Sequence, residues 1–291
     1  MKLDDVQASG IEDRRGGASR VPGGKATKLG VPGVIIAVII AIVSQAGGGG
    51  GGGGTGDAVG QILGQLAQGS TSASASVPET QGASLQGQEK FAGQMQTLLD
   101  GYWKPLLADS EEAFKAPTVV VFDGPTQTGG CGTGQPEAGP FYCPGDEKIY
   151  LDLAFYEQLE QQLGFDGDFA MAYVIAHEYG HHVQNLLGIN AQVREASDGA
   201  SEADANALSV KLELQADCFA GMWAKSASDA GRLEAGDFDE AIDAAAAVGD
   251  DAIQGSGASR ESFTHGSSAE RQQWFKTGFD RADASQCDTF S

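Results

Sequence analysis

The chain has 291 residues, enough for one sizeable globular domain with additional segments. It holds 40 acidic and 18 basic side chains, which gives a formal net charge of −22. Such a surface repels nucleic acid, so we expect no DNA or RNA partner. The excess of acid favours solubility but carries no information about the fold.

An apolar run near the start predicts a membrane anchor. Residues 1–30 are polar and glycine-rich, and VPGVIIAVIIAIV follows them without a charge. We place the anchor at 31–46, and with its flanks the apolar segment from Leu29 to Ala46 has 18 residues, which is at the short end of what a membrane-spanning helix needs. Five Lys and Arg residues between Arg14 and Lys28 predict a cytoplasmic N-terminus by the positive-inside rule. We therefore expect a single-pass protein of the cell membrane, with the rest of the chain extracytoplasmic.

Two other interpretations of 31–46 remain open. A cleaved signal peptide would explain Ser44-Gln45-Ala46 as a cleavage site, although the region before the apolar run is long for such a peptide. A soluble core helix fits poorly, because the eight consecutive glycines Gly47–Gly54 follow directly. Residues 47–88 are rich in glycine and serine and lack bulky side chains, so they predict a flexible linker.

Residues 89–291 have the pattern of a globular domain. Apolar side chains recur at helical spacing over 88–108, and short apolar runs predict strands at 117–122 and 148–152. After these strands the chain is mainly helical in pattern, over 153–163, 167–187, 202–227, 237–247 and 268–281. The sequence therefore predicts an α+β domain that is mainly helical, with a small β-sheet.

One of these helices carries a metal-binding pattern, His177-Glu178-Tyr179-Gly180-His181. Two His residues four positions apart lie on one face of a helix and can bind one Zn²⁺ together. Glu178 follows the first ligand and can take a proton from a water molecule that zinc has acidified. The chain has only four His, so a coincidental match is a poor explanation. We expect His177 and His181 to be zinc ligands and Glu178 to be the general base.

A catalytic zinc site needs a third protein ligand and one open position. Glu213 and Asp217 lie four residues apart beside an apolar helical stripe, where carboxylates are rare unless they are paired or bind metal. We expect Glu213 to be the third ligand and Asp217 to hold the outer nitrogen of a ligand His. Two alternatives stay open: Asp217 could be the third ligand with Glu213 structural, or both carboxylates could be exposed to solvent.

Several longer motifs carry a family resemblance. They are EDRRG near the start, GPFYCPGDEKIYLDLAFY, AHEYGHHVQNLLGI, LSVKLELQADCFAGMWA, HGSSAERQQWF and the final CDTF. Over most of its length the chain resembles the neutral zinc metallopeptidase family of bacterial membrane-anchored proteins. The resemblance implies a zincin-like catalytic fold, one N-terminal anchor and peptidase activity. It is also similar to peptidases in which HExxH is followed by ExxxD (the gluzincin type), which supports Glu213 over Asp217.

His265 and the four Cys residues are the remaining candidates. His265 could stabilise the oxyanion that develops in peptide hydrolysis, or it could be structural. An even number of Cys in an extracytoplasmic domain predicts disulfides. Cys131–Cys143 closes a short loop and Cys218–Cys287 would tie a helix to the C-terminus, although the sequence allows three connectivities.

Together these residues predict zinc-dependent hydrolysis of a peptide or protein substrate. We also expect the strand at Ile149–Asp152 to be a sheet edge that pairs with extended substrate. Two alternatives stay open, a zinc-stabilised surface binding module without turnover and a hydrolase for non-peptide amides. Glu178 argues against the binding module, because a purely structural zinc site has no need for a base.

Overall fold

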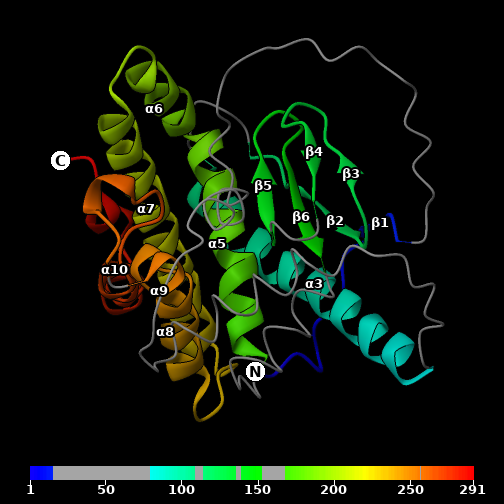
Figure 1. The fold of residues 1–291 in the computed structure, drawn as a ribbon. Coiled ribbons are helices and arrows are strands. Elements are labelled where there is room, and N and C mark those ends of the chain that lie inside the picture. The colour runs from blue at the N-terminus through cyan, green and yellow to red at the C-terminus, as the bar shows by residue number, and fades with distance from the viewer. Residues whose placement is uncertain (16–78, 109–113, 136–138, 153–167, 256) are drawn as a thin grey trace, which may run out of the picture.

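The computed structural model describes residues 1–15, 79–108, 114–135, 139–152, 168–255 and 257–291. This part of the chain is α+β, mainly helical with a small sheet, and confirms the predicted fold class (Figure 1). The predicted anchor at 31–46, most of the predicted linker and the predicted helix at 153–163 lie outside the described residues. None of the described helices combines the length and apolar composition that crossing a bilayer requires.

The main sheet has four strands in the order β1 (Glu12–Asp13), β2 (Thr118–Phe122), β6 (Lys148–Asp152) and β5 (Phe141–Cys143). The β1–β2 and β2–β6 pairs are parallel, whereas β5 and β6 are antiparallel. The strands β3 (Thr126–Gln127) and β4 (Thr133–Gly134) form a separate pair. Both β2 and β6 were predicted, and they are almost entirely buried because apolar side chains fill both of their faces.

This strand order corrects the prediction that Ile149–Asp152 forms a sheet edge. β6 pairs with β2 on one side and with β5 on the other, so its backbone groups are already used. The edge strand on that side is β5, which lies in the Gly/Pro-rich segment that gave no strand signal. Cys143 of β5 forms the predicted disulfide with Cys131.

The helices lie mostly on one side of the sheet with α5 next to it, although α3 packs against β2 separately (Figure 1). They are α3 (Glu79–Leu106), α5 (Phe169–Leu186), α6 (Ile189–Ser197), α7 (Glu202–Asp229), α8 (Asp237–Ala247), α9 (Asp250–Gln254) and α10 (Ser268–Arg281). Two short 3₁₀ turns, η2 (Arg260–Ser262) and η3 (Ala284–Cys287), complete the C-terminal part. The predicted disulfide Cys218–Cys287 ties α7 to η3, so the favoured connectivity is confirmed.

The crossing of α5 and α7 sets the geometry of the site. A Cβ atom on Gly180 would lie 3.0 Å from the carbonyl oxygen of Ala216 and 3.1 Å from its Cα atom. These distances are shorter than ordinary van der Waals contacts, so a glycine lets the two backbones approach here. Gly180 lies inside the HExxH sequence and Ala216 lies three residues after Glu213. The close approach therefore brings the expected third ligand towards the two histidines.

Two segment boundaries differ from the prediction. Helix α3 begins at Glu79, within the predicted linker, because the residues up to 88 include good helix formers and no proline. Residues 1–15 pack on the folded domain, although a polar tail was expected over 1–30. Met1 and Leu3 are buried in the main core, and Val6 and Ile11 pack against it. Composition alone misses this, because four apolar side chains suffice to dock a short segment.

Candidate metal centre

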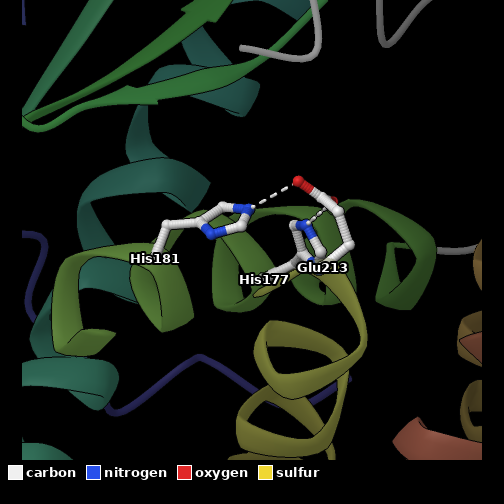
Figure 2. Close-up of side chains that lie close together, drawn as sticks. All are labelled: His177, His181 and Glu213. Carbon is white, nitrogen blue, oxygen red and sulfur yellow. Dashed lines mark hydrogen bonds and ion pairs between the residues drawn. The ribbon is translucent and has the colours of Figure 1, made fainter. Parts of the chain in front are cut away.

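The three expected ligands lie together at the crossing of α5 and α7 (Figure 2). His177 Nε2 is 3.1 Å from Glu213 Oε2, and His181 Nε2 is 3.4 Å from Glu213 Oε1. One ligand atom from each residue falls within 4.8 Å of the others. One helical turn separates the histidines, so both rings project to the same side of α5, as the four-residue spacing predicts.

The outer nitrogen of His177 is held by Asp217, as expected. His177 Nδ1 is 2.8 Å from Asp217 Oδ1, and a carboxylate oxygen can only accept a hydrogen bond there. Nδ1 therefore carries the proton and Nε2 is the atom that remains for a metal. This second contact fixes the ring and raises the basicity of the ligand nitrogen.

The outer nitrogen of His181 is held by Gln184, which the sequence analysis did not identify. His181 Nδ1 is 2.8 Å from Gln184 Oε1. The amide nitrogen of Gln184 donates to the carbonyl oxygen of Leu212 at 2.8 Å, which fixes which end of the amide faces the histidine. His181 therefore also presents Nε2 to the centre. The i, i+3 spacing of the two residues on α5 could have suggested this contact.

The charge balance of the three residues fits a bound cation. Burial would raise the pKa of Glu213, but His181 and His177 hold it well below its usual value, so the carboxylate is ionised. Burial would likewise lower the pKa of His177, but Asp217 and Glu213 raise it to about 9. Without a metal, protons therefore supply the positive charge between these groups. Two imidazoles and one carboxylate are the ligand set of many catalytic zinc sites.

Glu178 lies beside this centre with both carboxylate oxygens buried and without a hydrogen-bond partner among the described residues. Burial raises its pKa, although His181 and His177 act in the opposite direction. The backbone amide of Tyr142 in β5 lies near enough to lower this pKa slightly, but it does not form a hydrogen bond with Glu178. A buried carboxylate without partners is costly, so this position is built to receive a polar group from outside the chain.

Asp217 is itself held by two residues that the sequence analysis missed. Arg271 of α10 donates from Nε to Asp217 Oδ2 at 2.8 Å and from Nη2 to Oδ1 at 2.9 Å. The hydroxyl of Tyr173 donates to the same Oδ1 at 2.6 Å. Burial would raise the pKa of Asp217, but Arg271 and His177 lower it. Arg271 lies within the motif HGSSAERQQWF, but nothing in its spacing points to Asp217.

His265 lies in the loop before α10, with Asp250 as its main support. Asp250 Oδ2 accepts the backbone N–H groups of Thr264, His265 and Gly266 at 2.8, 2.6 and 2.9 Å. His265 is buried, with 5% of its surface exposed. The loop is docked on α7, because Ser209 donates to the carbonyl oxygen of Thr264 at 2.8 Å. His265 is therefore a buried residue on a loop that is fixed against α7, the helix that carries Glu213.

Two further groups near these helices are not assigned to the centre. His182 points away from it, towards the hydroxyl of Tyr142 and the carbonyl oxygen of Lys115. A second acidic group comprises Asp168, Asp237 and Glu240. The amino group of Met1 contacts Asp168 and also lies near Asp237, so a cation of the chain itself lies against this group.

The comparisons with known proteins agree with this geometry. Residues 2–290 match the protein family described as "Putative neutral zinc metallopeptidase". The protein YpfJ of Escherichia coli K12, described as uncharacterized, is 45% identical over 204 residues, which cover 69% of this chain and 71% of YpfJ. The uncharacterized protein Rv2575 of Mycobacterium tuberculosis H37Rv is 40% identical over 207 residues, 66% of this chain and 67% of that protein. No solved structure matches the chain. The chain therefore belongs to the neutral zinc metallopeptidase family.

Proposed function

We propose that this protein hydrolyses peptide bonds with one Zn²⁺ held by His177, His181 and Glu213. The observation that carries the proposal is the state of Glu178. Its two buried oxygens have no partner among the described residues, and they lie next to a three-residue ligand set. A structural zinc site has no use for such a group, whereas a hydrolytic site needs a base at this position.

A zinc ion at this centre would lower the pKa of water towards about 7 and polarise a substrate carbonyl. The residues of the chain supply the remaining steps. Glu178 takes the proton of the attacking water and passes it to the leaving amine. Its pKa is raised by burial, which makes it a better proton acceptor at neutral pH than an exposed carboxylate. Asp217 and Gln184 keep the two imidazoles oriented throughout.

His265 is proposed to stabilise the oxyanion that forms on the substrate carbonyl. Its backbone and its loop are fixed by Asp250, so the imidazole is preorganised rather than mobile. Its Nδ1 lies 3.0 Å from the hydroxyl of Thr264 and 3.4 Å from Asp250 Oδ1, which leaves Nε2 for a substrate.

The substrate is proposed to bind as an extended strand along β5. This strand has one neighbour, β6, in the described part of the sheet. The hydroxyl of Tyr142 in β5 is 3.0 Å from Nδ1 of His182, so β5 lies beside the helix that carries Glu178. A peptide added to this edge would therefore run past the base, with backbone hydrogen bonds as its main contacts.

We further propose that the domain works outside the cytoplasm. The chain has four Cys residues, and the structure pairs all of them in two disulfides. Disulfides persist in oxidising compartments and are rare in the cytosol. Attachment to the membrane through 31–46 stays a prediction from the sequence.

The test measures cleavage of a peptide library by the full-length protein. Glu178→Gln should keep its zinc and lose cleavage, because the amide cannot accept the proton. His265→Gln should keep zinc and lower kcat by about 10²–10³-fold, the usual effect of one oxyanion donor. The matched control is Glu195→Gln, at an exposed position of α6, which should behave as wild type.

Three outcomes would count against the proposal. Cleavage by Glu178→Gln at the wild-type rate would exclude it as the base. Zinc without any cleavage in wild type would favour the binding module. Backbone N-methylation of the peptides at alternate positions should raise KM if β5 pairs with substrate, and uniform tolerance would rule that pairing out.

A further inference from the structure

The N-terminal segment, defined here as residues 1–15, lies across the outside of the domain (Figure 1). At its start, the backbone N–H of Lys2 donates to the carbonyl oxygen of Arg232 at 2.8 Å. The side-chain amide of Gln94 in α3 then donates to the carbonyl oxygens of Leu3 and Val6 at 2.9 and 2.8 Å. These contacts fix the backbone of the segment and not merely its side chains.

The segment next passes over α3 at Gly93. The backbone N–H of Ser9 donates to the carbonyl oxygen of Gly93 at 3.0 Å. A Cβ atom on Gly93 would lie 2.7 Å from the carbonyl oxygen of Ser9 and 3.0 Å from the Cβ atom of Ala8. Any other residue at 93 would therefore push the segment away. The helix is shaped to receive this segment, although glycine has a lower helix propensity than alanine.

The segment ends as β1, a strand of the main sheet. Glu12 and Asp13 pair in parallel with Val120 and Val121 of β2. Lys148 of β6 donates to Glu12 at 2.6 Å, which ties the segment to a third strand. Glu12 and Asp13, the first two residues of the EDRRG motif, are thus part of the sheet.

Both arginines of that motif are also used inside the fold. Arg14 donates to the carbonyl oxygen of Gln127 at 2.7 Å, and its guanidinium lies over the ring of Tyr150. Arg15 forms ion pairs with Asp13 and with Glu89 of α3. These are two of the five cationic residues on which the prediction of a cytoplasmic N-terminus depends. Their presence is explained by the fold, which weakens the positive-inside argument.

We propose that residues 1–15 and the domain formed by 79–291 lie on the same side of the membrane. Hydrogen bonds of about 3 Å cannot form across a hydrocarbon layer of about 30 Å. The expected arrangement, with a cytoplasmic N-terminus and an extracytoplasmic peptidase, would separate Ser9 from Gly93 and β1 from β2. The segment is instead a strap on the peptidase domain.

The strap also forms one edge of the main sheet. In the described sheet β1 is the terminal strand at one end and β5 at the other. An edge strand of two residues offers few backbone groups for pairing with other chains.

The side of the membrane is tested with single-cysteine reporters in the full-length chain. The probe is a membrane-impermeant maleimide. The four native cysteines are paired in disulfides, and wild type treated in the same way gives the labelling that any reduced native cysteine contributes. Asp4→Cys marks the strap and Gly101→Cys marks α3, and both positions are exposed. The reagent is applied to intact spheroplasts that produce each variant, and again after lysis.

The proposal expects the two reporters to behave alike. Labelling of both in intact spheroplasts supports it, and so does labelling of both only after lysis. The second result would in addition contradict the extracytoplasmic location proposed above, so the two proposals can be judged separately. Labelling of one reporter before lysis and of the other only afterwards would overturn the proposal.

The contact with α3 is tested with Gly93→Ala, for which Gly101→Ala on the same helix is the matched control. A Cβ on Gly101 would meet no atom within 4 Å. Gly93→Ala should speed tryptic cleavage of the Arg14–Arg15 bond at least several-fold, as read by mass spectrometry, whereas Gly101→Ala should leave it at the wild-type rate. Equal cleavage in both variants would show that the strap does not depend on α3.

Discussion

Asp217 is the most heavily supported carboxylate of the site. Its Oδ1 receives hydrogen bonds from His177, Tyr173 and Arg271, and Arg271 also reaches Oδ2. Both Asp217 and Arg271 are almost fully buried. Removing one partner of such a pair leaves a buried charge uncompensated. Arg271 therefore acts on the metal through Asp217 and His177, as a positioning residue.

Replacing Arg271 by methionine should weaken zinc binding. Methionine fills the space of the arginine stem but leaves Asp217 without its bidentate partner, so the orientation of His177 is less well defined. We expect the zinc dissociation constant to rise about 10–100-fold, the usual effect of losing such support. The control is Arg281→Met at the exposed end of α10. Equal zinc affinity in the two variants, measured by chelator competition, would contradict the role of Arg271.

His182 gives a prediction for the pH dependence of folding. Its burial lowers its pKa to about 4, against 6.5 for an unperturbed histidine. At a pH between these two values, His182 binds a proton in the unfolded chain but not in the folded chain. The contribution of His182 to stability is therefore complete above about pH 6.5 and is lost as the pH falls towards 4. Between pH 7 and pH 5 the loss should be about 2 kcal/mol.

The measurement is denaturant unfolding of the metal-free protein at pH 7 and pH 5, with His182→Gln for comparison. A glutamine side chain cannot titrate, so the variant should lose less stability than wild type over this interval. Identical losses in the two proteins would show that His182 is not the group responsible.

The sequence identified the site residues that lie close together in a helix. His177, Glu178 and His181 follow from spacing, and Glu213 with Asp217 follows from carboxylates beside an apolar stripe. Arg271 and Asp250 could not be found in this way, because each acts on a residue far away in the chain. Only the packing of α10 and α9 against α7 and the His265 loop reveals them.

At the scale of elements, the crossing of α5 and α7 determines where the ligands meet. Gly180→Ala should disturb this crossing, because the added methyl group meets the backbone of Ala216 at about 3 Å. Alanine stabilises a helix by about 1 kcal/mol relative to glycine, so the same substitution at an uncrowded helix position would stabilise the protein. We expect instead no gain in stability and weaker zinc binding. The control, Gly101→Ala on α3, should be stabilised by up to about 1 kcal/mol with unchanged zinc affinity.

A stabilised Gly180→Ala with wild-type zinc affinity would exclude the crossing as a determinant of the site. Thermal unfolding and zinc titration of both variants provide the comparison.

Helices with a strong apolar period were predicted within a few residues, namely α5, α7, α8 and α10. The short elements β5, α6 and α9 were missed, because few residues make a weak periodic signal. The predicted edge at β6 was wrong because strand order depends on partners, and a sequence gives no register between distant strands. The strap was missed for the same reason, since β1 has only two residues.

At the scale of the whole molecule, the first and last described segments of the chain pack on different parts of the domain. The disulfide Cys218–Cys287 brings the C-terminal end to α7, and Gln215 of that helix donates to the carbonyl oxygen of Cys287 at 2.9 Å. The strap reaches the sheet from the opposite end of the chain. A truncated domain that begins near residue 89 would lack the strap, so experiments on this protein should use the full chain.

The central claim is that His177, His181 and Glu213 bind one zinc ion, and zinc titration of the full-length protein tests it most directly. The comparison is between wild type, Glu213→Gln and Glu202→Gln, which lies at an exposed position of the same helix. We predict one zinc per chain in wild type and in Glu202→Gln, and a loss of tight binding in Glu213→Gln. Absence of zinc from wild type, or undiminished binding in Glu213→Gln, would contradict the account, and the second result would point to Asp217 as the ligand.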